Sequence, residues 1–259
     1  MKGLQISEVT GVSFSFTIEA ARRMEELPKQ FFAKLTAMAR EKIAQGFDII
    51  NLGQGNPDQP TPAHIVQAMQ RATEKPLYHG YAPFQGYDFL KEAIATYYQR
   101  EFGVELDPYK EVAILFGGKT GLVEVSLCLL NPGDVCLVPD PGYPDYWSGI
   151  SLAGAKMEMM PLLAENDFLP DYRAIPRQAL AKAKMMFINY PNNPTAAVAT
   201  PQFFKKTVDF AYAHQLTVIH DFAYGAIGFD GQKPVSFLEI FFNDTATTEI
   251  YTMSKTYNM

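Results

Sequence analysis

Three consecutive residues, Gly118-Lys119-Thr120, stand in the order found in the phosphate loops of nucleotide-binding proteins. Such a loop has the pattern G-x-x-x-x-G-K-[ST], and its first glycine position holds Ala113 here, inside an apolar stretch. The spacing therefore excludes a nucleotide loop. A glycine pair before a helix still presents free backbone N–H groups, which favour an anion. The sequence thus predicts an anion site at these residues.

Other side chains capable of chemistry also follow apolar stretches. They are Tyr143, Asn193, Asp221, Tyr224 and, near the end of the chain, Lys255. A lysine amine can form an imine with an aromatic aldehyde, and a carboxylate beside a ring nitrogen keeps that nitrogen protonated. Hydroxyl and amide donors suit a phenolate oxygen, and an aromatic side chain suits the ring face. Together with the anion turn, the set predicts a Schiff-base site for a phosphate-bearing aromatic aldehyde.

These residues need a scaffold that brings distant parts of the chain together. Apolar stretches without alternation, typical of strands covered on both faces, occur at 111–118, 133–140, 182–190 and 216–222. Helical patterns lie between several of them, as at 120–130 and 200–215. This alternation predicts an α/β domain with an open, largely parallel sheet and helices on both faces. Ligands of such sheets bind beyond the carboxyl ends of the strands.

The first part of the chain has a different pattern. Residues 12–46 are predicted to be mainly amphipathic helix, and 47–50 a short strand. Thr61 and Pro62 predict the start of another helix over 63–74, with the threonine as its N-cap and the proline at its first position.

Composition limits the classes of function. The 259 residues are 47% hydrophobic with a formal net charge of −6, which suits a domain that acts on small molecules. No basic cluster indicates nucleic acid, no apolar stretch approaches the about 18 residues of a membrane helix, and the start lacks a signal peptide. Cys128 and Cys136 have no metal-type spacing, and the pattern predicts buried thiols in a reducing compartment, hence a cytoplasmic protein.

Three motifs in a fixed order give the chain a resemblance to a known family. They are NYPNNPT at 189–195, HDFAYGAIGFD at 220–230 and SKTYNM at 254–259. With this order and separation the chain resembles the pyridoxal-phosphate-dependent aminotransferases of fold type I, class I/II. The stretches NLGQGNPDQPTP, ILFGGKTGLVE and VPDPGYPDYW are similar to the branch that includes methionine and related aliphatic or aromatic aminotransferases.

The resemblance implies an organisation and a set of roles. Residues 48–259 would form the large, cofactor-binding domain, and the helical segment 1–47 would belong to an incomplete small domain. Lys255 would be the Schiff-base lysine and the proton-transfer base, and Asp221 would face the ring nitrogen. Tyr224 and Asn193 would donate to the phenolate oxygen, and Tyr143 would stack on the ring. The implied phosphate ligands are Gly118, Lys119, Thr120, Thr252, Ser254 and Tyr81 of the neighbouring subunit of a homodimer, and the implied substrate contacts are Gly55 and Asn193.

The chain departs from the family pattern at two places. The family commonly has glycine after NNPT, where this chain has Ala196, and alanine disfavours a positive-φ turn by about 1 kcal/mol. Residues 241–252 replace a variable loop with a polar stretch whose core, NDTATTEIYT, matches a translated sequencing-library adapter. We interpret this stretch as an assembly artefact in the gene.

The resemblance also implies two arginines beyond Met259, one for the phosphate and one for the substrate carboxylate. A truncated chain without that carboxylate clamp is expected to bind the cofactor weakly and not to turn over.

The sequence leaves several functions open. The main expectation is amino transfer from an L-amino acid, such as methionine or another uncharged or aromatic one, to a 2-oxo acid. A C–S lyase on the same fold and an inactive truncated fragment are the alternatives. A transcription regulator is disfavoured because residues 1–46 contain no helix-turn-helix and no basic face.

Overall fold

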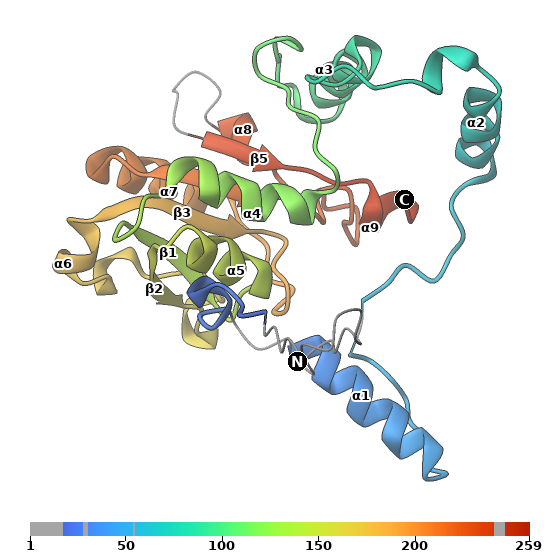
Figure 1. The fold of residues 1–259 in the computed structure, drawn as a ribbon. Helices are drawn as coiled ribbons and strands as arrows, with labels where there is room; N and C mark the ends of the chain where they lie inside the picture. Colours follow the sequence, from blue (N-terminus) through green and yellow to red (C-terminus); the bar gives the residue numbers. More distant parts are fainter. Residues whose placement is uncertain (1–17, 28–30, 54, 241–246) are drawn as a thin grey trace, which may run out of the picture.

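The computed structural model describes residues 18–27, 31–53, 55–240 and 247–259. Its centre is a parallel sheet in the order β2-β1-β3-β4-β5 (Figure 1). The strands are β1 (Val135–Asp140), β2 (Lys156–Pro161), β3 (Ala183–Asn189), β4 (Thr217–Asp221) and β5 (Thr247–Ile250). The predicted α/β fold with a parallel sheet is confirmed.

Helices cover both faces of this sheet (Figure 1). On β3, Met185 and Phe187 pack with α4 (Gly118–Leu129) and α5 (Pro144–Leu152). Met186 and Ile188 pack with α7 (Pro201–His214) and α8 (Phe237–Ile240) on the opposite face. Successive side chains of a strand point to opposite faces, so a strand with two covered faces is apolar at every position. This explains the continuous apolar stretches of the sequence.

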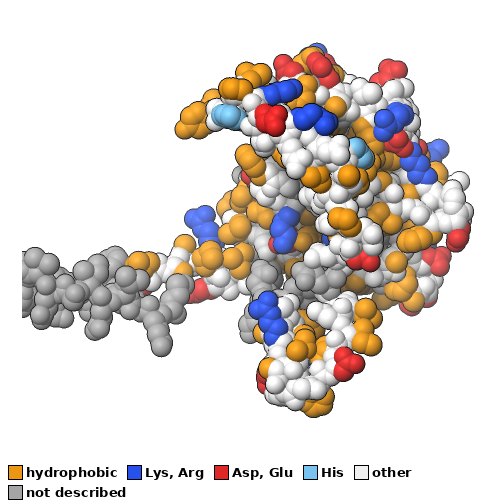
Figure 2. All heavy atoms as spheres, turned by 90° about the vertical axis from the view of Figure 1, so that its right-hand side faces the viewer, with side chains coloured by type: hydrophobic (Ala, Val, Ile, Leu, Met, Phe, Trp, Pro, Cys, Tyr) orange, Lys and Arg blue, Asp and Glu red, His pale blue; other side chains and the backbone are white. Residues whose placement is uncertain are grey.

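The N-terminal helices extend away from the sheet (Figure 1). They are α1 (Phe31–Ala44), α2 (Ala63–Thr73) and α3 (Asp88–Phe102), and α3 returns to pack Tyr98 and Phe102 against Phe222. In the segment between α1 and α2, Ile50 and Leu52 are 82% and 89% exposed, and Figure 2 shows many hydrophobic side chains on the side of the molecule that carries α2. Among the described residues, none of the helices is long and apolar enough to cross a membrane.

The remaining short elements connect these layers. They are the 3-10 turns η1 (Arg22–Met24), η2 (Pro76–Tyr78), η3 (Ala164–Asn166) and η4 (Tyr172–Ala174), and the helices α6 (Arg177–Leu180) and α9 (Ser254–Tyr257). Within the region predicted to be mainly helical, the structure has η1 and α1, while residues 12–17 and 28–30 lie outside the described residues.

Two of the expected strands do not form. Residues 111–117 and 47–50 are irregular, and residue 118 already begins α4. A strand is defined by a ladder of hydrogen bonds to a neighbour, and neither segment forms one with the described strands. Apolar composition alone was therefore not enough to predict a strand at these two segments.

Two expectations about single residues are also wrong. Thr61 does not cap α2, because its hydroxyl donates to the carbonyl of Asn258 at 2.6 Å and Pro62 occupies the N-cap position. Cys128 is exposed on the outer side of α4, whereas Cys136 on β1 is buried as expected.

The end of the stretch interpreted as an artefact is built into the sheet as β5. Residues 241–246 lie outside the described part, but β5 pairs with β4 from Val218↔Thr247 to Asp221↔Ile250. The buried carboxylate of Glu249 accepts hydrogen bonds from the Tyr98 hydroxyl at 2.8 Å and from the Phe237 amide at 3.0 Å, and lies 2.7 Å from Nδ1 of His220. Glu249 thereby joins α3, α8 and β4 to β5.

The turn after NNPT has the strained conformation that the sequence suggested. Ala196 has a φ of 62°, in the left-handed region, and its amide donates to the Asn192 carbonyl at 2.9 Å. An L-residue with a Cβ pays about 1 kcal/mol there, whereas glycine does not.

We therefore expect Ala196→Gly to raise the free energy of unfolding by about 1 kcal/mol, because glycine relieves the left-handed strain. Urea denaturation followed by circular dichroism measures the change. The control is Ala93→Gly, an exposed residue inside α3, which should lower the free energy of unfolding by about 1 kcal/mol. A loss of stability in both variants would contradict the strain argument.

Candidate cofactor site

The ends of three neighbouring strands define the site. Parallel pairing aligns Asn189 with Asp221 and Asp221 with Ile250, so the carboxyl ends of β3, β4 and β5 lie at one edge. The Asn189 amide donates to the Asp221 carbonyl at 2.8 Å, and its oxygen accepts from the Asn193 amide nitrogen at 2.8 Å. Asn189 thus holds the half-buried Asn193 next to the end of β4.

Asp221 is a carboxylate held almost completely out of water. The Tyr146 hydroxyl donates to its Oδ2 at 2.6 Å, and the Ala223 amide donates to its Oδ1 at 3.3 Å. Burial raises the pKa of Asp221 above its usual value, while the hydrogen bond from Tyr146 and the nearby charge of Lys255 lower it in part. A cation placed beside this carboxylate would therefore stabilise its charged form.

Lys255 reaches the same edge from α9, which follows β5. Its Nζ donates to the Gly55 carbonyl at 3.0 Å and lies 5.9 Å from the centre of the Tyr224 ring. Burial and the charge of Asp221 raise the pKa of Tyr224, so its hydroxyl stays protonated and can donate a hydrogen bond. The structure therefore brings together four of the predicted residues from distant parts of the sequence: Gly55, Asp221, Tyr224 and Lys255.

The glycine turn before α4 has the backbone geometry on which the predicted anion site depends, and we refer to the amides of 118–120 as the anion cradle. Gly117 has a φ of 90°, which favours glycine, and α4 begins at the next residue. The Gly121 amide donates back to the Gly117 carbonyl at 3.4 Å. The amides of 118–120 precede this first turn and therefore point out of the helix N-terminus, where an anion is favoured.

A second group of donors lies against this cradle. A Cβ added to Gly118 would stand 3.5 Å from the Cβ of Thr252, so the two segments touch. The Thr252 hydroxyl donates to the Ser254 hydroxyl at 3.0 Å, so these side chains are adjacent. The Thr120 hydroxyl instead donates to the Phe116 carbonyl at 3.0 Å, which leaves its backbone amide as its free donor.

Tyr143 lies at the start of α5, next to the first turn of α4. Its half-buried ring lies 5.7 Å below the Nζ of Lys119, which forms an ion pair with Asp145 at 3.0 Å. The hydrogen bond to Asp145 raises the pKa of Lys119. The Lys119 side chain thus lies over the Tyr143 ring, and its backbone belongs to the anion cradle.

One predicted residue stays apart from this group. Tyr81 is fully exposed between η2 and α3, and no contact joins it to the other site residues that the structure describes. Its expected role lies in a neighbouring subunit.

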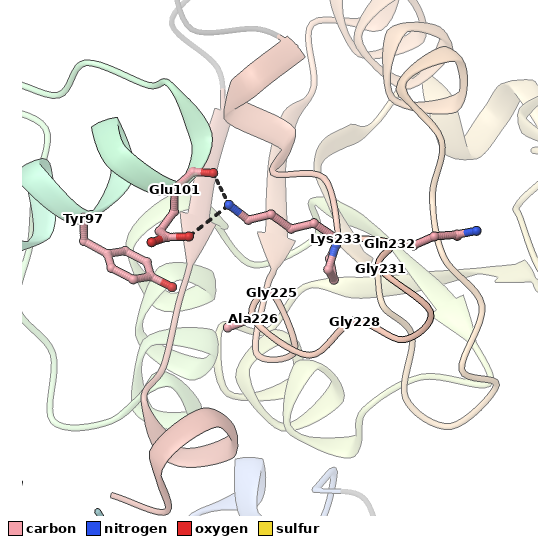
Figure 3. Close-up of a pocket in the computed structure, with 9 residues that line it drawn as sticks. Tyr97, Glu101, Gly225, Ala226, Gly228, Gly231, Gln232 and Lys233 are labelled. Atoms are coloured by element: carbon pink, nitrogen blue, oxygen red, sulfur yellow. Dashed lines mark hydrogen bonds and ion pairs between the residues drawn. The ribbon is translucent and has the colours of Figure 1, made fainter.

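A separate cavity of about 300 Å³ lies beside the site strands (Figure 3). It lies between α3 and the loop 225–234, and Lys233 points across it to Glu101, with Nζ 3.0 Å from Oε2. None of its described lining residues belongs to the predicted cofactor set. The described residues also contain no group of His, Cys, Asp and Glu able to hold a metal ion.

Two residues of the quoted motifs that are important for the geometry were given no role in the sequence analysis. Asn189 bridges two strand ends, and Tyr146 supplies the hydroxyl that binds Asp221. Tyr146 follows the N-cap residue Tyr143 of α5 by three residues, about one helical turn. This spacing could have indicated that both rings lie on the same side of α5.

The donor set fits pyridoxal phosphate. The cradle of α4 with the hydroxyls of Thr252 and Ser254 suits a phosphate, and the buried carboxylate suits a protonated ring nitrogen. Lys255 is an amine at the same edge, and Tyr143 offers an aromatic face. No part of this set requires a metal.

The comparison with known proteins identifies the family of the chain. The chain belongs to the family of class I and II aminotransferases, whose model matches residues 48–259. It is 60% identical to the L-glutamine:4-(methylsulfanyl)-2-oxobutanoate aminotransferase of Bacillus subtilis, over 93% of this chain and 61% of that protein. It is 48% identical to an LL-diaminopimelate aminotransferase of Desulforudis audaxviator, over 92% of this chain and 61% of that protein.

Solved structures give the same result. The substrate-bound structure of BacF from Bacillus subtilis matches this chain with a TM-score of 0.87 and 53% sequence identity. The match covers 94% of this chain and 62% of the BacF chain. Aspartate aminotransferase from Thermotoga maritima has a TM-score of 0.85 at 29% identity, covering 93% and 63%. The chain therefore spans about three fifths of the length of these relatives.

The raised pKa of Asp221 has a consequence for stability. The folded protein holds the proton of this carboxyl more tightly than the unfolded chain, so stability falls as the pH rises above about 3.9, the usual pKa of aspartate. Asp221→Asn removes this penalty. We expect the variant, without cofactor, to unfold at a higher temperature than the wild type at neutral pH, and the difference to vanish below about pH 3.9.

The matched control is Asp171→Asn. Arg173 lowers the pKa of the Asp171 carboxyl, so here the charged form stabilises the folded state and the amide should lose stability at neutral pH. Equal effects of the two substitutions would contradict the interpretation of Asp221.

Proposed function

We propose that these residues form the cofactor site of a pyridoxal-phosphate-dependent aminotransferase, which transfers the amino group of an L-amino acid to a 2-oxo acid. The observation that carries the proposal is the convergence of Lys255, Tyr224 and the desolvated Asp221 at the ends of β4 and β5, beside an anion cradle. Family membership over residues 48–259 supports it independently.

Each residue has a defined task in this reaction. The cofactor, when bound, supplies an electron sink for the charge left on the substrate Cα. Lys255 would be the covalent attachment point, and its amine, once the substrate has released it, would carry a proton between the substrate Cα and C4′ of the cofactor. Asp221 keeps the ring nitrogen protonated, and Tyr224 and Asn193 donate to the phenolate oxygen. Gly55, whose carbonyl holds the lysine amine, borders the substrate together with Asn193.

The whole protein is proposed to be a cytoplasmic homodimer. Residues 1–47 would join a small domain and 48–259 a large one, and the exposed Tyr81 would reach the phosphate bound by the partner. The amino donor is proposed to be methionine or another uncharged or aromatic L-amino acid. The 60% identity to an enzyme named for 4-(methylsulfanyl)-2-oxobutanoate supports this choice.

Lys255→Ala should abolish the covalent binding of pyridoxal phosphate, because no other amine of the described site approaches Tyr224 and Gly55 in this way. The expected result is loss of the visible absorbance of the bound cofactor and of the mass increase after borohydride reduction. In the whole protein, amino transfer should fall by at least about 10²- to 10⁴-fold, the usual contribution of a positioned acid–base group.

The matched control is Lys233→Ala, a lysine of the separate cavity in Figure 3. The Lys233→Ala variant should keep the visible absorbance of bound pyridoxal phosphate. Persistence of that absorbance in Lys255→Ala would contradict the proposal. Release of pyruvate and ammonia from a sulfur-containing amino acid without any 2-oxo acid would assign the protein to the C–S lyases instead.

A further inference from the structure

We propose that Tyr146 is a positioning residue, which aims one oxygen of Asp221 at the ring nitrogen of the cofactor and thereby selects rings that carry an N–H group there. This inference rests on the proposed function of the site. It concerns a residue that has no expected contact with the cofactor or the substrate.

The hydrogen bond between these two side chains lies in a dry part of the core. Tyr146 is 0% exposed and Asp221 is 7% exposed, and their oxygens are 2.6 Å apart. A hydroxyl that donates to a carboxylate is a charge-assisted donor, and such bonds are short and strong. The contact joins α5 to the end of β4 across 75 residues of sequence. It therefore couples two elements of the site.

The ring of Tyr146 cannot easily follow a moving carboxylate. It stacks on Phe187 of β3 with a centroid distance of 4.6 Å and an interplanar angle of 12°, and it meets the Tyr143 ring edge-on at 5.9 Å. Both neighbours are fixed by the sheet or by the start of α5. The hydroxyl is thus a rigid reference point, and the carboxylate orients toward it.

This geometry gives the two carboxylate oxygens different tasks. Oδ2 is occupied by the Tyr146 hydroxyl at 2.6 Å, while Oδ1 has only the Ala223 amide at 3.3 Å. The less engaged oxygen is the one available to a ring N–H group. The hydrogen bond from Tyr146 also lowers the pKa of Asp221, as do the neighbouring His220 and Lys255. Without the hydroxyl, both the orientation and the ionisation of Asp221 are weakened.

The test compares two ligands on the full chain. One is pyridoxal phosphate, and the other is its analogue in which carbon replaces the ring nitrogen. Tyr146→Phe keeps the ring that stacks on Phe187 and removes one oxygen. We expect the dissociation constant of pyridoxal phosphate to rise about 10- to 100-fold in this variant, the effect of losing a hydrogen bond to a charged group. The dissociation constant of the carbon analogue should stay unchanged.

A second measurement reads Asp221 directly in the absence of any ligand. The infrared band of a protonated carboxyl that Asp221→Asn removes should persist to higher pH in Tyr146→Phe than in the wild type. The groups that face this carboxyl are Tyr146 on α5, His220 on β4, the Ala223 amide and Tyr224 in the following loop, and Lys255 on α9.

The matched control is Tyr172→Phe. Tyr172 also stacks on a phenylalanine, Phe210, with a centroid distance of 4.4 Å, and its hydroxyl bonds to Thr207 at 2.8 Å, on the other face of the sheet. It should change neither dissociation constant. Because the readout is a ratio of two constants from the same sample, partial unfolding of a variant cancels out.

Two failures can be told apart. If the wild type does not bind pyridoxal phosphate through Lys255, the proposed function is wrong. If the wild type binds it but Tyr146→Phe weakens both ligands equally, or neither, the proposed function stands and the role of Tyr146 is wrong.

Discussion

The site depends on a carboxylate that the fold keeps away from water. Burial of Asp221 opposes its charge, and the protein compensates through one short hydrogen bond, one longer one and the charge of neighbouring side chains. The folded protein therefore carries an electrostatic cost that a bound cation can relieve. The layered core creates this cost, because β4 lies inside the sheet between β3 and β5.

Much of this arrangement could be predicted from the sequence. The continuous apolar stretches that became β1, β3 and β4 are unusual outside a sheet with two covered faces, and the polar residues that follow them had to meet at one edge. The order of the motifs around Asp221 and Lys255 then indicated the chemistry. The left-handed turn at Ala196 was also visible, because the family commonly has glycine there.

The remaining features depend on contacts between distant residues. Residues 111–117 have the composition of a strand, but a strand also needs a hydrogen-bonded neighbour. Thr61 has the composition of a helix cap, but its hydroxyl finds the Asn258 carbonyl at the far end of the chain. The bond from Tyr146 to Asp221 and the network around Glu249 likewise join segments whose proximity no local pattern encodes.

The two thiols of this chain are chemically unequal, and that difference offers an experimental handle. Burial raises the pKa of Cys136, which suppresses its reactive thiolate, whereas Cys128 is exposed on α4. An alkylating dye should consequently attach to Cys128 alone. Since α4 rises about 1.5 Å per residue from Gly118, the dye would sit about 15 Å from the anion cradle. A fluorophore at that range can report occupancy of the cradle by energy transfer, with no mutation needed to install it.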